Sequence, residues 1–441
     1  MTDARFEPSG PLRGSLRPPS DKSISHRAAL IAAMGEGETD IEGYLEAADT
    51  RSTLNAMRAL GAKVSGHVTI SASLDPPGSW STRAKTIEGV GLRRACPSPI
   101  DVGNAGTLLR LLPGWLAGQP RGAWTLDGDD SIRRRPVDRI AVPLRQMGAD
   151  LSAREDRLPP LEVRGAPLRG ITYEMPIASA QIKSCLLFAG LLAEGETRIV
   201  EPLPSRDHSE RMLAAAGADV RREDDAVVIR PAERLEPGRI VVPADISSAA
   251  FFIIAALLVE RSEVVLEEVN VNPTRTGLLT ILERMGAAVE REGEREEGGE
   301  PIADLRVRPA SLQATEVGGA EIPLAIDELP LVALAACFAE GRTVIRDAEE
   351  LRRKESDRIE TVTAALRALG GKIEPTADGM VIEGTGGLRG GAIESHGDHR
   401  IAMLGAVAGL ASKEGVEVQG MDAAAVSYPG FESDLSRLLN R

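Results

Sequence analysis

The sequence predicts an α/β protein made of two similar domains, each with three small modules. Six short polar or glycine-bearing motifs recur along the 441 residues, and each is followed by an unusually apolar helical segment. A strand-like stretch follows each apolar segment, and in five copies a second helical segment then ends in glycine, a small residue and a β-branched run. The period of roughly 65–85 residues exceeds the roughly 20–50 residues of stacked repeats, so each copy is expected to be a separate α/β module.

The six motifs mark the expected N-termini of the apolar helices. They occupy residues 20–27, 103–107, 179–183, 245–248, 326–328 and 397–400. The segments 249–259, 329–338 and 401–411 are apolar nearly all round, which is typical of buried helices. Each second helix is expected to end at a left-handed glycine, and these are Gly61, Gly148, Gly217, Gly286 and Gly370. The C-terminus cuts the sixth copy short near Leu438.

Three modules per domain is the natural division of six copies. The break is expected between the third and fourth copies. The N-terminal strand, which ends before Pro18-Pro19, is expected to pair with the C-terminal domain, because two prolines indicate a crossing segment. The predicted domains are therefore residues 1–19 plus 244–441, and residues 20–243.

Composition excludes several classes of protein. The net charge of −14 argues against nucleic acid and anionic membranes as partners, since both require a basic surface. Cys96, Cys185 and Cys337 are odd in number and show no metal-ligand spacing, which favours a reducing compartment. No apolar run approaches the about 20 residues of a membrane span, so a cytoplasmic protein is expected. The charged stretch 291–300 is interpreted as a solvated loop without function.

Cations gather at the expected helix starts. A helix N-terminus already carries about half a positive charge, so a cation in its first turn is unfavourable unless an anion binds there. This placement predicts a site for small, multiply charged acids, and the cations concerned are Lys22, His26, Arg27, Lys183, His399 and Arg400.

Residues 20–27 form the most specific motif. Ser23 and Arg27 are four residues apart and share a helix face, with Lys22 at its start. An ordinary capped surface helix is the alternative. Because residues 28–34 are apolar, the helix is expected to point inward and its cations to bind a ligand.

The remaining motifs are individually weak. Residues 103–107 form a glycine-rich turn of a common kind, and the arginines of 133–135 would also suit a solvated loop. Arg206 and Arg275 open amphipathic helices, and capping or packing explains Arg275 equally well. His208 is expected to be a packing or supporting residue rather than a catalyst.

Two charged motifs in the C-terminal half also have ordinary explanations. Lys354 and Arg358 are four residues apart with Glu355 between them, which a charged helix face would also give. Asp327 precedes a buried helix, where a carboxylate is a normal cap. The number of separate cation clusters in so acidic a protein nevertheless favours anion binding.

In order and in combination, these motifs closely resemble the 5-enolpyruvylshikimate-3-phosphate (EPSP) synthase family over essentially the whole chain. The matching segments are 20–27, 104–107, 135–136, 179–181, 354–358 and 398–400. Segments 179–181, 206–210 and 272–277 resemble the second bacterial class more than the first. The resemblance implies two domains of three βαβαββ units each, an inside-out α/β barrel, with the active site in the cleft between them.

The resemblance also implies a reaction. The family transfers the enolpyruvyl group of phosphoenolpyruvate to the 5-hydroxyl of shikimate 3-phosphate and releases phosphate, by addition and then elimination. No metal or organic cofactor is implied. The expected partners are the two small-molecule substrates alone, the expected state is a monomer, and glyphosate is expected to compete with phosphoenolpyruvate.

Site residues follow from the resemblance position by position. Shikimate 3-phosphate would bind to Lys22, Ser23, Arg27, Ser179, Ala180, Gln181, Arg206, Asp327 and Lys354. Phosphoenolpyruvate would bind to Lys22, Asn104, Gly106, Arg135, Gln181, Arg358 and Arg400. Arginine suits this role because its planar fork binds carboxylate and phosphate with two parallel hydrogen bonds.

Three residues are implied to be catalytic. Asp327 would accept the proton of the attacking hydroxyl, and Glu355 and Lys22 are the candidates for proton transfer at the methylene carbon. Many family members carry a lysine before the Ser-aromatic-Pro segment near the C-terminus, but Val426 stands there in this chain. One phosphoenolpyruvate contact is therefore missing or replaced.

Two alternatives remain open. The sister transferase that acts on UDP-N-acetylglucosamine shares the fold but uses a cysteine five residues before an Arg-Pro pair, and Asp130 stands at that position here. A non-catalytic anion-binding homologue is the other alternative, which Lys22, Asp327 and Glu355 argue against.

Overall fold

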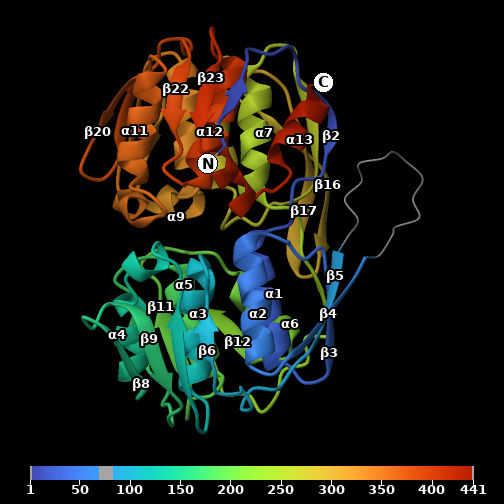
Figure 1. Ribbon diagram of the computed structural model, residues 1–441, viewed down its shortest axis with the longest axis vertical. Coiled ribbons are helices and arrows are strands. Elements are labelled where there is room, and N and C mark those ends of the chain that lie inside the picture. Colours follow the sequence, from blue (N-terminus) through green and yellow to red (C-terminus); the bar gives the residue numbers. More distant parts are fainter. Residues whose placement is uncertain (1, 69–82, 440–441) are drawn as a thin grey trace. The chain divides into compact units, whose positions relative to one another are not determined.

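The computed structural model describes residues 2–68 and 83–439 (Figure 1). The chain separates into two compact units. Unit 1 comprises the chain up to Asp21, then Pro243–Glu296 and the chain from Pro301 onward, and unit 2 comprises Lys22–Val242 and Glu297–Glu300. Within the described residues, no helix is long and apolar enough to cross a membrane.

The modules of unit 2 share one topology, in which two strand–helix pairs precede a two-stranded hairpin. The second module is β6 (Pro99–Asp101), α3 (Gly106–Ala117), β7 (Ala123–Asp127), α4 (Asp138–Gln146), β8 (Asp150–Arg154) and β9 (Leu158–Arg164). Its sheet order is β6-β7-β9-β8, with only the first pair parallel. The third module repeats this order with β10 (Thr172–Glu174), α5 (Ala180–Gly190), β11 (Thr197–Val200), α6 (His208–Ala215), β12 (Val220–Glu223) and β13 (Ala226–Ile229).

The first module of unit 2 takes its first strand from a distant part of the chain. It contains α1 (Lys22–Met34), β3 (Glu38–Glu42), α2 (Ala48–Ala59), β4 (Lys63–Val68) and β5 (Arg83–Glu88). The strand that pairs in parallel with β3 is β14 (Arg239–Val241), which follows the third module. The unit is therefore closed by its own last strand.

Unit 1 repeats the arrangement. Its first module is β2 (Arg13–Leu16), α7 (Ile246–Leu258), β15 (Glu263–Asn270), α8 (Gly277–Arg284), β16 (Val289–Glu297) and β17 (Glu300–Val307). Its second is β18 (Glu316–Val317), α10 (Leu329–Phe338), β19 (Arg342–Ile345), α11 (Arg358–Ala368), β20 (Lys372–Pro375) and β21 (Met380–Glu383). Its third is β22 (Gly391–Glu394), α12 (His399–Ala411), β23 (Val416–Gln419) and α13 (Phe431–Leu438), with β1 (Ala4–Phe6) on β23.

The predicted βαβαββ modules are confirmed in five copies, and the sixth is a three-stranded version in which β1 takes the place of the hairpin. The pairing of the N-terminal strands with the C-terminal half is confirmed as well. Strand β1 runs antiparallel to β23, and β2 runs parallel to β15. Short helical segments complete the connections, namely η1 (Ile132–Arg134), η2 (Gly319–Glu321), α9 (Ile322–Ala325), η3 (Glu349–Arg353) and η4 (Met421–Val426).

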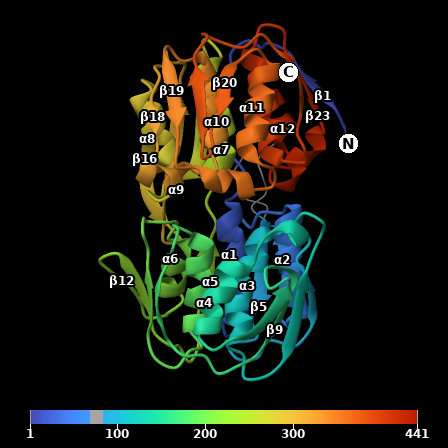
Figure 2. The ribbon, with the colours of Figure 1, turned by 90° about the vertical axis from the view of Figure 1, so that its left-hand side faces the viewer.

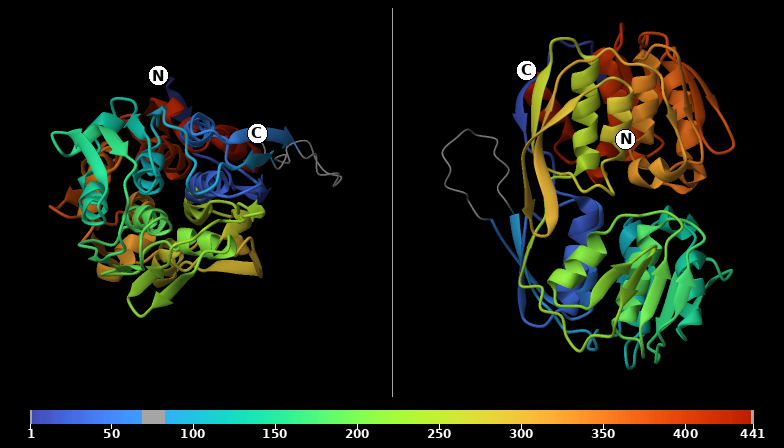
Figure 3. Two further views of the ribbon diagram at one scale, coloured as in Figure 1. Left: turned by 90° about the horizontal axis from the view of Figure 1, so that it is seen from below. Right: turned by 180° about the vertical axis from the view of Figure 1, so that it is seen from behind.

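The six apolar helices form the cores of the two units, as the sequence predicts. In unit 2, α3 packs against α5 and also contacts α1 (Figure 2). In unit 1, α7, α10 and α12 pack on one another, and every residue of α7 from Ile246 to Leu257 is buried. The sheets cover these helices from outside (Figure 3). Each unit thus has its own apolar core.

The helix stops are also confirmed. All five predicted glycines have φ between +92° and +102°, a conformation that only glycine adopts without strain. Each glycine lets the chain turn directly from the second helix into the hairpin of its module.

The prediction of a solvated loop at 291–300 is wrong. Residues 289–307 form a hairpin of β16 and β17 that turns at Gly298 and Gly299, both with positive φ. Strand β16 is an exposed edge strand, so its charges face water and pair across the hairpin, as Arg306 does with Glu292 at 2.7 Å. A charged edge strand lacks the apolar alternation that identifies strands in a sequence.

Candidate active site

The predicted site residues of unit 2 lie at the N-termini of its three core helices. Lys22 is the first residue of α1 and Gly106 the first of α3, while Ser179 is the N-cap of α5. The Ser179 hydroxyl accepts a hydrogen bond from the amide of Ile182 at 3.4 Å, which leaves Ala180 and Gln181 in the first turn. The tertiary fold therefore brings together three motifs that are far apart in the sequence.

Arg27 joins α1 to the two helices of the third module. Its Nε donates to Ser209 Oγ at 2.7 Å, and its Nη2 donates to Ser184 Oγ at 3.1 Å. Nη1 also donates to the carbonyl of Ser23 at 3.0 Å. Arg206 approaches the same point, because its Nη1 lies 3.5 Å from Ser23 Oγ. Ser23, Arg27 and Arg206 thus form one cluster, of which Arg27 is buried and the other two are half-buried.

A second group forms around the start of α3. A Cβ placed on Gly106 would lie 2.5 Å from Nη1 of Arg135, so the guanidinium group covers this glycine closely. The Gly106 amide donates a hydrogen bond back to the carbonyl of Asn104 at 2.9 Å. Gln181 Nε2 reaches Thr107 Oγ1 at 3.4 Å and so links α5 to α3.

Lys22 has a partner that the sequence analysis missed. Its Nζ donates to Oδ2 of Asp49 at 3.1 Å, and Asp49 is buried in the first turn of α2. The sequence offers one signal for this partner, which is an acidic residue in the first turn of a predicted helix. That signal is too common to identify a particular partner.

The predicted site residues of unit 1 converge on Asp327. Lys354 Nζ lies 3.3 Å from Asp327 Oδ1, and Arg358 Nη1 lies 3.5 Å from the same oxygen. Arg400 Nη1 donates to the Asp327 carbonyl at 2.8 Å, and Arg358 Nη2 donates to Glu355 Oε2 at 2.5 Å. All five predicted residues of this unit therefore belong to one cluster.

Asp398 organises this cluster, although it was not predicted as a site residue. It caps α12 through the amide of Arg400, and it accepts the Nε of Arg358 at 2.9 Å. Burial raises its pKa, but Arg358 and His399 lower it more strongly, so the pKa lies below its ordinary value. Burial lowers the pKa of Arg358, while Asp398, Glu355 and Asp327 raise it above the ordinary value. Both groups stay charged at neutral pH.

The contacts of Arg275 correspond to a packing role, which was the alternative to ligand binding for this residue. Its side chain is buried, and Nη2 donates to Asp245 Oδ1 at 3.2 Å and to Ser247 Oγ at 2.6 Å. The Ser247 hydroxyl binds in turn to Glu328 Oε1, which lies 3.6 Å from Arg400 Nη1. Arg275 thus supports α7 and, through Glu328, the surroundings of Arg400.

Two expectations about cations are wrong. Lys183 does not face an anion site, because it is buried between Glu201 and Glu210. His26 is fully buried and its Nδ1 lies 2.6 Å from Thr53 Oγ1. The alternative of a charged helix face for Lys354 and Arg358 does not hold, because α11 begins only at Arg358.

The interpretation of His208 as a supporting residue agrees with its contacts. It is fully buried, and its Nδ1 lies 2.7 Å from Oε1 of Glu300, which is also buried. Arg133 instead forms an exposed pair with Asp127 at 2.9 Å. Arg133 is therefore a solvent-exposed residue, as expected if residues 133–135 formed a solvated loop. Arg135, by contrast, lies against Gly106.

Most of the predicted residues are half-buried, which suits a binding site. Only Arg27, Gly106 and Arg358 are buried. A half-buried side chain is held by its neighbours and still presents polar atoms outward. Each cluster combines fixed cations with a polar helix N-terminus, which is an arrangement that binds phosphate and carboxylate.

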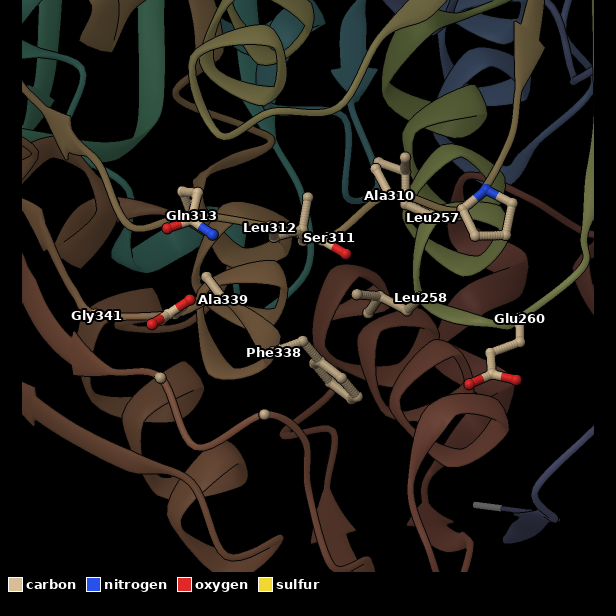
Figure 4. Close-up of a pocket in the computed structure, with 14 residues that line it drawn as sticks. Leu257, Leu258, Glu260, Ala310, Ser311, Leu312, Gln313, Phe338, Ala339 and Gly341 are labelled. Atoms are coloured by element: carbon tan, nitrogen blue, oxygen red, sulfur yellow. The ribbon is translucent and has the colours of Figure 1, made fainter.

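Unit 1 also contains a hollow of about 660 Å³ that contains none of the predicted residues (Figure 4). Its walls come from the C-terminal ends of α7 and α10 and from residues 309–313. The lining mixes apolar side chains such as Leu257 and Phe338 with the polar Gln313 and the carboxylates of Glu260 and Glu340. It lacks the cations needed for a multiply charged acid.

Comparison with known proteins assigns the family. The sequence model of EPSP synthase (3-phosphoshikimate 1-carboxyvinyltransferase) matches residues 6–435. The chain is 52% identical over 424 residues to a 3-phosphoshikimate 1-carboxyvinyltransferase of Anaeromyxobacter, which covers 96% of this chain and 95% of the relative. It is 50% identical over 427 residues to one of Alkalilimnicola ehrlichii, with 96% and 93% covered.

Solved structures agree. The structure of EPSP synthase from Acinetobacter baumannii has a TM-score of 0.84 and 42% identity, over 99% of this chain and 97% of that one. The enolpyruvyl transferase NikO from Streptomyces tendae has a TM-score of 0.74 at 16% identity, over 98% and 96%, which shows a common fold. The repeated βαβαββ modules and the match over nearly the whole chain together lead to one conclusion. The chain belongs to the EPSP synthase family, the 3-phosphoshikimate 1-carboxyvinyltransferases.

Proposed function

We propose that this chain carries out the family's reaction with the two residue clusters acting on the same pair of substrates. The enolpyruvyl group of phosphoenolpyruvate is transferred to the 5-hydroxyl of shikimate 3-phosphate, which gives EPSP and phosphate. The observation that carries the proposal is the cluster around Asp327. There a carboxylate suited to accept a proton lies beside three cations, Lys354, Arg358 and Arg400, suited to hold an anionic substrate.

Asp327 is proposed as the base that accepts the proton of the attacking 5-hydroxyl. The hydroxyl oxygen bonds to C2 of phosphoenolpyruvate while a proton is added to its methylene carbon, which gives a tetrahedral intermediate. Loss of a proton from the new methyl group then expels phosphate and restores the double bond. The adjacent Lys354 and Arg358 support this role because they hold the Asp327 carboxylate in a defined position, which proton transfer requires.

Glu355 and Lys22 are proposed to transfer the proton at the methylene carbon. Glu355 is half-buried and held by Arg358 at 2.5 Å, and Lys22 is held by Asp49 at 3.1 Å. Both side chains are therefore fixed in direction, which proton transfer to carbon requires.

Shikimate 3-phosphate is proposed to bind to the start of α5 and the cluster of Ser23, Arg27 and Arg206. The contacts of Ser23 support this assignment, since Arg27 bonds to its carbonyl and Arg206 approaches its hydroxyl, which places two cations beside one residue. Ser179, Ala180, Gln181 and Lys354 would complete the site. Phosphoenolpyruvate is proposed to bind to Asn104, Gly106, Arg135, Arg358 and Arg400.

The cysteines argue against the sister transferase. Asp130, at the position of its cysteine, has a side chain that is 94% exposed. Burial raises the pKa of Cys337 to about 12 and raises that of Cys185 still further. Neither thiol is activated for attack at neutral pH. A third thiol, Cys96, lies outside both clusters.

Phosphate release tests the proposal. The purified chain is incubated with both substrates and then with each one omitted. Phosphate is expected only when both are present, with EPSP formed in equal amount. Release with UDP-N-acetylglucosamine in place of shikimate 3-phosphate would establish the sister activity, and no release with either acceptor would show a non-catalytic protein.

We also propose that the enzyme acts as a monomer in the cytoplasm. The three free cysteines support a reducing compartment. Equilibrium sedimentation that gives the mass of one chain, and fractionation of the source cells, are the tests.

A further inference from the structure

The buried pair of Lys183 and Glu201 lies next to the segment that carries Arg206. Both side chains are 0% exposed, and Lys183 Nζ lies 3.0 Å from Glu201 Oε2. The same Nζ donates to the carbonyl of Ser205 at 3.2 Å and pairs with Glu210 Oε1 at 2.7 Å. The ammonium group is thus surrounded by Glu201, Glu210 and the carbonyl of Ser205, so Lys183 acts inside the protein.

Ser205 is held by this pair through all of its polar groups. Glu201 Oε1 accepts from the amide of Ser205 at 3.2 Å and from its hydroxyl at 2.5 Å. Its carbonyl accepts from Lys183. The connection between β11 and α6 also contains Pro202 and Pro204, which have no amide hydrogen to donate.

Stability alone does not explain the buried pair, because removing two charges from water costs several kcal/mol per ion. Apolar residues of similar volume often stabilise such a site equally well. An ion pair with several hydrogen bonds differs from apolar residues because it fixes one backbone conformation. Ser205 directly precedes Arg206, whose Nη1 reaches Ser23 Oγ at 3.5 Å.

We propose that Lys183 and Glu201 are positioning residues that fix Ser205 and thereby aim Arg206 at the phosphate group of shikimate 3-phosphate. The proposal rests on the assignment of Arg206 to that substrate. It predicts that loss of the Glu201 charge weakens binding of shikimate 3-phosphate through Arg206, while phosphoenolpyruvate retains its own contacts.

The test measures the dissociation constant of shikimate 3-phosphate by calorimetry without phosphoenolpyruvate. Glu201→Gln keeps the side-chain volume and one acceptor oxygen but removes the charge that binds Lys183. It is expected to raise the dissociation constant about tenfold. This is the size of effect expected when a charge-assisted hydrogen bond to the substrate is misaligned. The KM for phosphoenolpyruvate is expected to change by less than about twofold. Glu223→Gln is the control, because Glu223 lies on β12 and pairs with Arg198 and Arg221 only at the rim of the same sheet.

A double-mutant cycle separates positioning from general structural damage. In an Arg206→Ala background, Glu201→Gln is expected to change the dissociation constant by less than about twofold, because its route to the substrate is already lost. Ser205→Ala removes a single hydroxyl contact and is expected to give a smaller rise of the same kind. This variant keeps the test decisive if Glu201→Gln does not fold.

The outcomes distinguish the proposals. Equal weakening by Glu201→Gln with and without Arg206, or no weakening by either Glu201→Gln or Ser205→Ala, would overturn the positioning role. An Arg206→Ala variant that binds shikimate 3-phosphate as tightly as the native chain would instead overturn the assignment of Arg206.

Discussion

Replacing Gly106 with alanine is expected to weaken the site for phosphoenolpyruvate through Arg135. The new Cβ would lie 2.5 Å from Arg135 Nη1, whereas ordinary contacts begin at 3.4 Å, so the guanidinium has to move by about 0.9 Å. A hydrogen bond of ordinary length from Arg135 to an anion would then be broken or badly strained. Such a bond is worth about 1.5–3 kcal/mol, which corresponds to a rise of about 10–100-fold in the KM for phosphoenolpyruvate.

The stability of the variant is not expected to fall. The atom in the way is the end of a flexible side chain, and alanine favours a helix more than glycine does. Gly106 is the first residue of α3 and needs no left-handed backbone. Thermal unfolding should therefore separate a local effect on Arg135 from a folding defect.

Steady-state kinetics with both substrates varied, together with inhibition by glyphosate, is the assay. Glyphosate is expected to compete with phosphoenolpyruvate, and its inhibition constant should rise more than the KM because it is the longer ligand. Gly10→Ala is the control, since no atom lies within 4 Å of a Cβ at Gly10. An unchanged KM for phosphoenolpyruvate in Gly106→Ala would refute the reasoning.

Three further changes test other parts of the molecule. Asp327→Asn should lower kcat by about 10²–10⁴-fold with little change in the affinity for shikimate 3-phosphate, and near-normal turnover would make Asp327 only a structural residue. Burial and the charge of Asp21 raise the pKa of Asp245 to about 6, so this group stabilises the fold below about pH 4 and loses that effect as the pH rises through 6. Over that pH range, the unfolding free energy of Asp245→Asn should fall less than that of the native chain. Identical pH profiles for the two would contradict a raised pKa of Asp245. Tyr428→Phe removes a buried hydrogen bond of 2.8 Å to Asp434 and should cost about 1 kcal/mol in urea unfolding, so an unchanged midpoint would show that the bond contributes nothing.

The repeat architecture could be predicted from the sequence because its signals are local. The apolar helices α7, α10 and α12 are hydrophobic on all faces, and such a segment has no stable place outside a core. Glycines such as Gly61 and Gly217 mark helix stops because of their own backbone freedom. Both signals act within a few residues and do not depend on the rest of the fold.

The polar site residues could be located in the sequence, but their partners could not. Lys183 and Arg206 both lie near predicted helix starts, yet the fold surrounds Lys183 with Glu201 and Glu210 and leaves Arg206 half-buried beside Ser23. The role of a charge depends on which opposite charges the fold brings within a few ångströms, and these partners come from other elements.

Dependence on partners from other elements also explains why the sequence did not reveal the β16–β17 hairpin or the contact of Arg135 with Gly106. The hairpin of β16 and β17 is a strand pair only because β15 offers it a neighbour, so its charged sequence alone suggested a loop. Arg135 and Gly106 are 29 positions apart in the sequence numbering, and only tertiary packing places the guanidinium against the glycine. The sequence by itself therefore determined the modules, the buried helices and the candidate residues. The tertiary structure decided which of those residues are neutralised inside the protein and which can meet a substrate, because electrostatic contacts depend on distance in space and not along the chain.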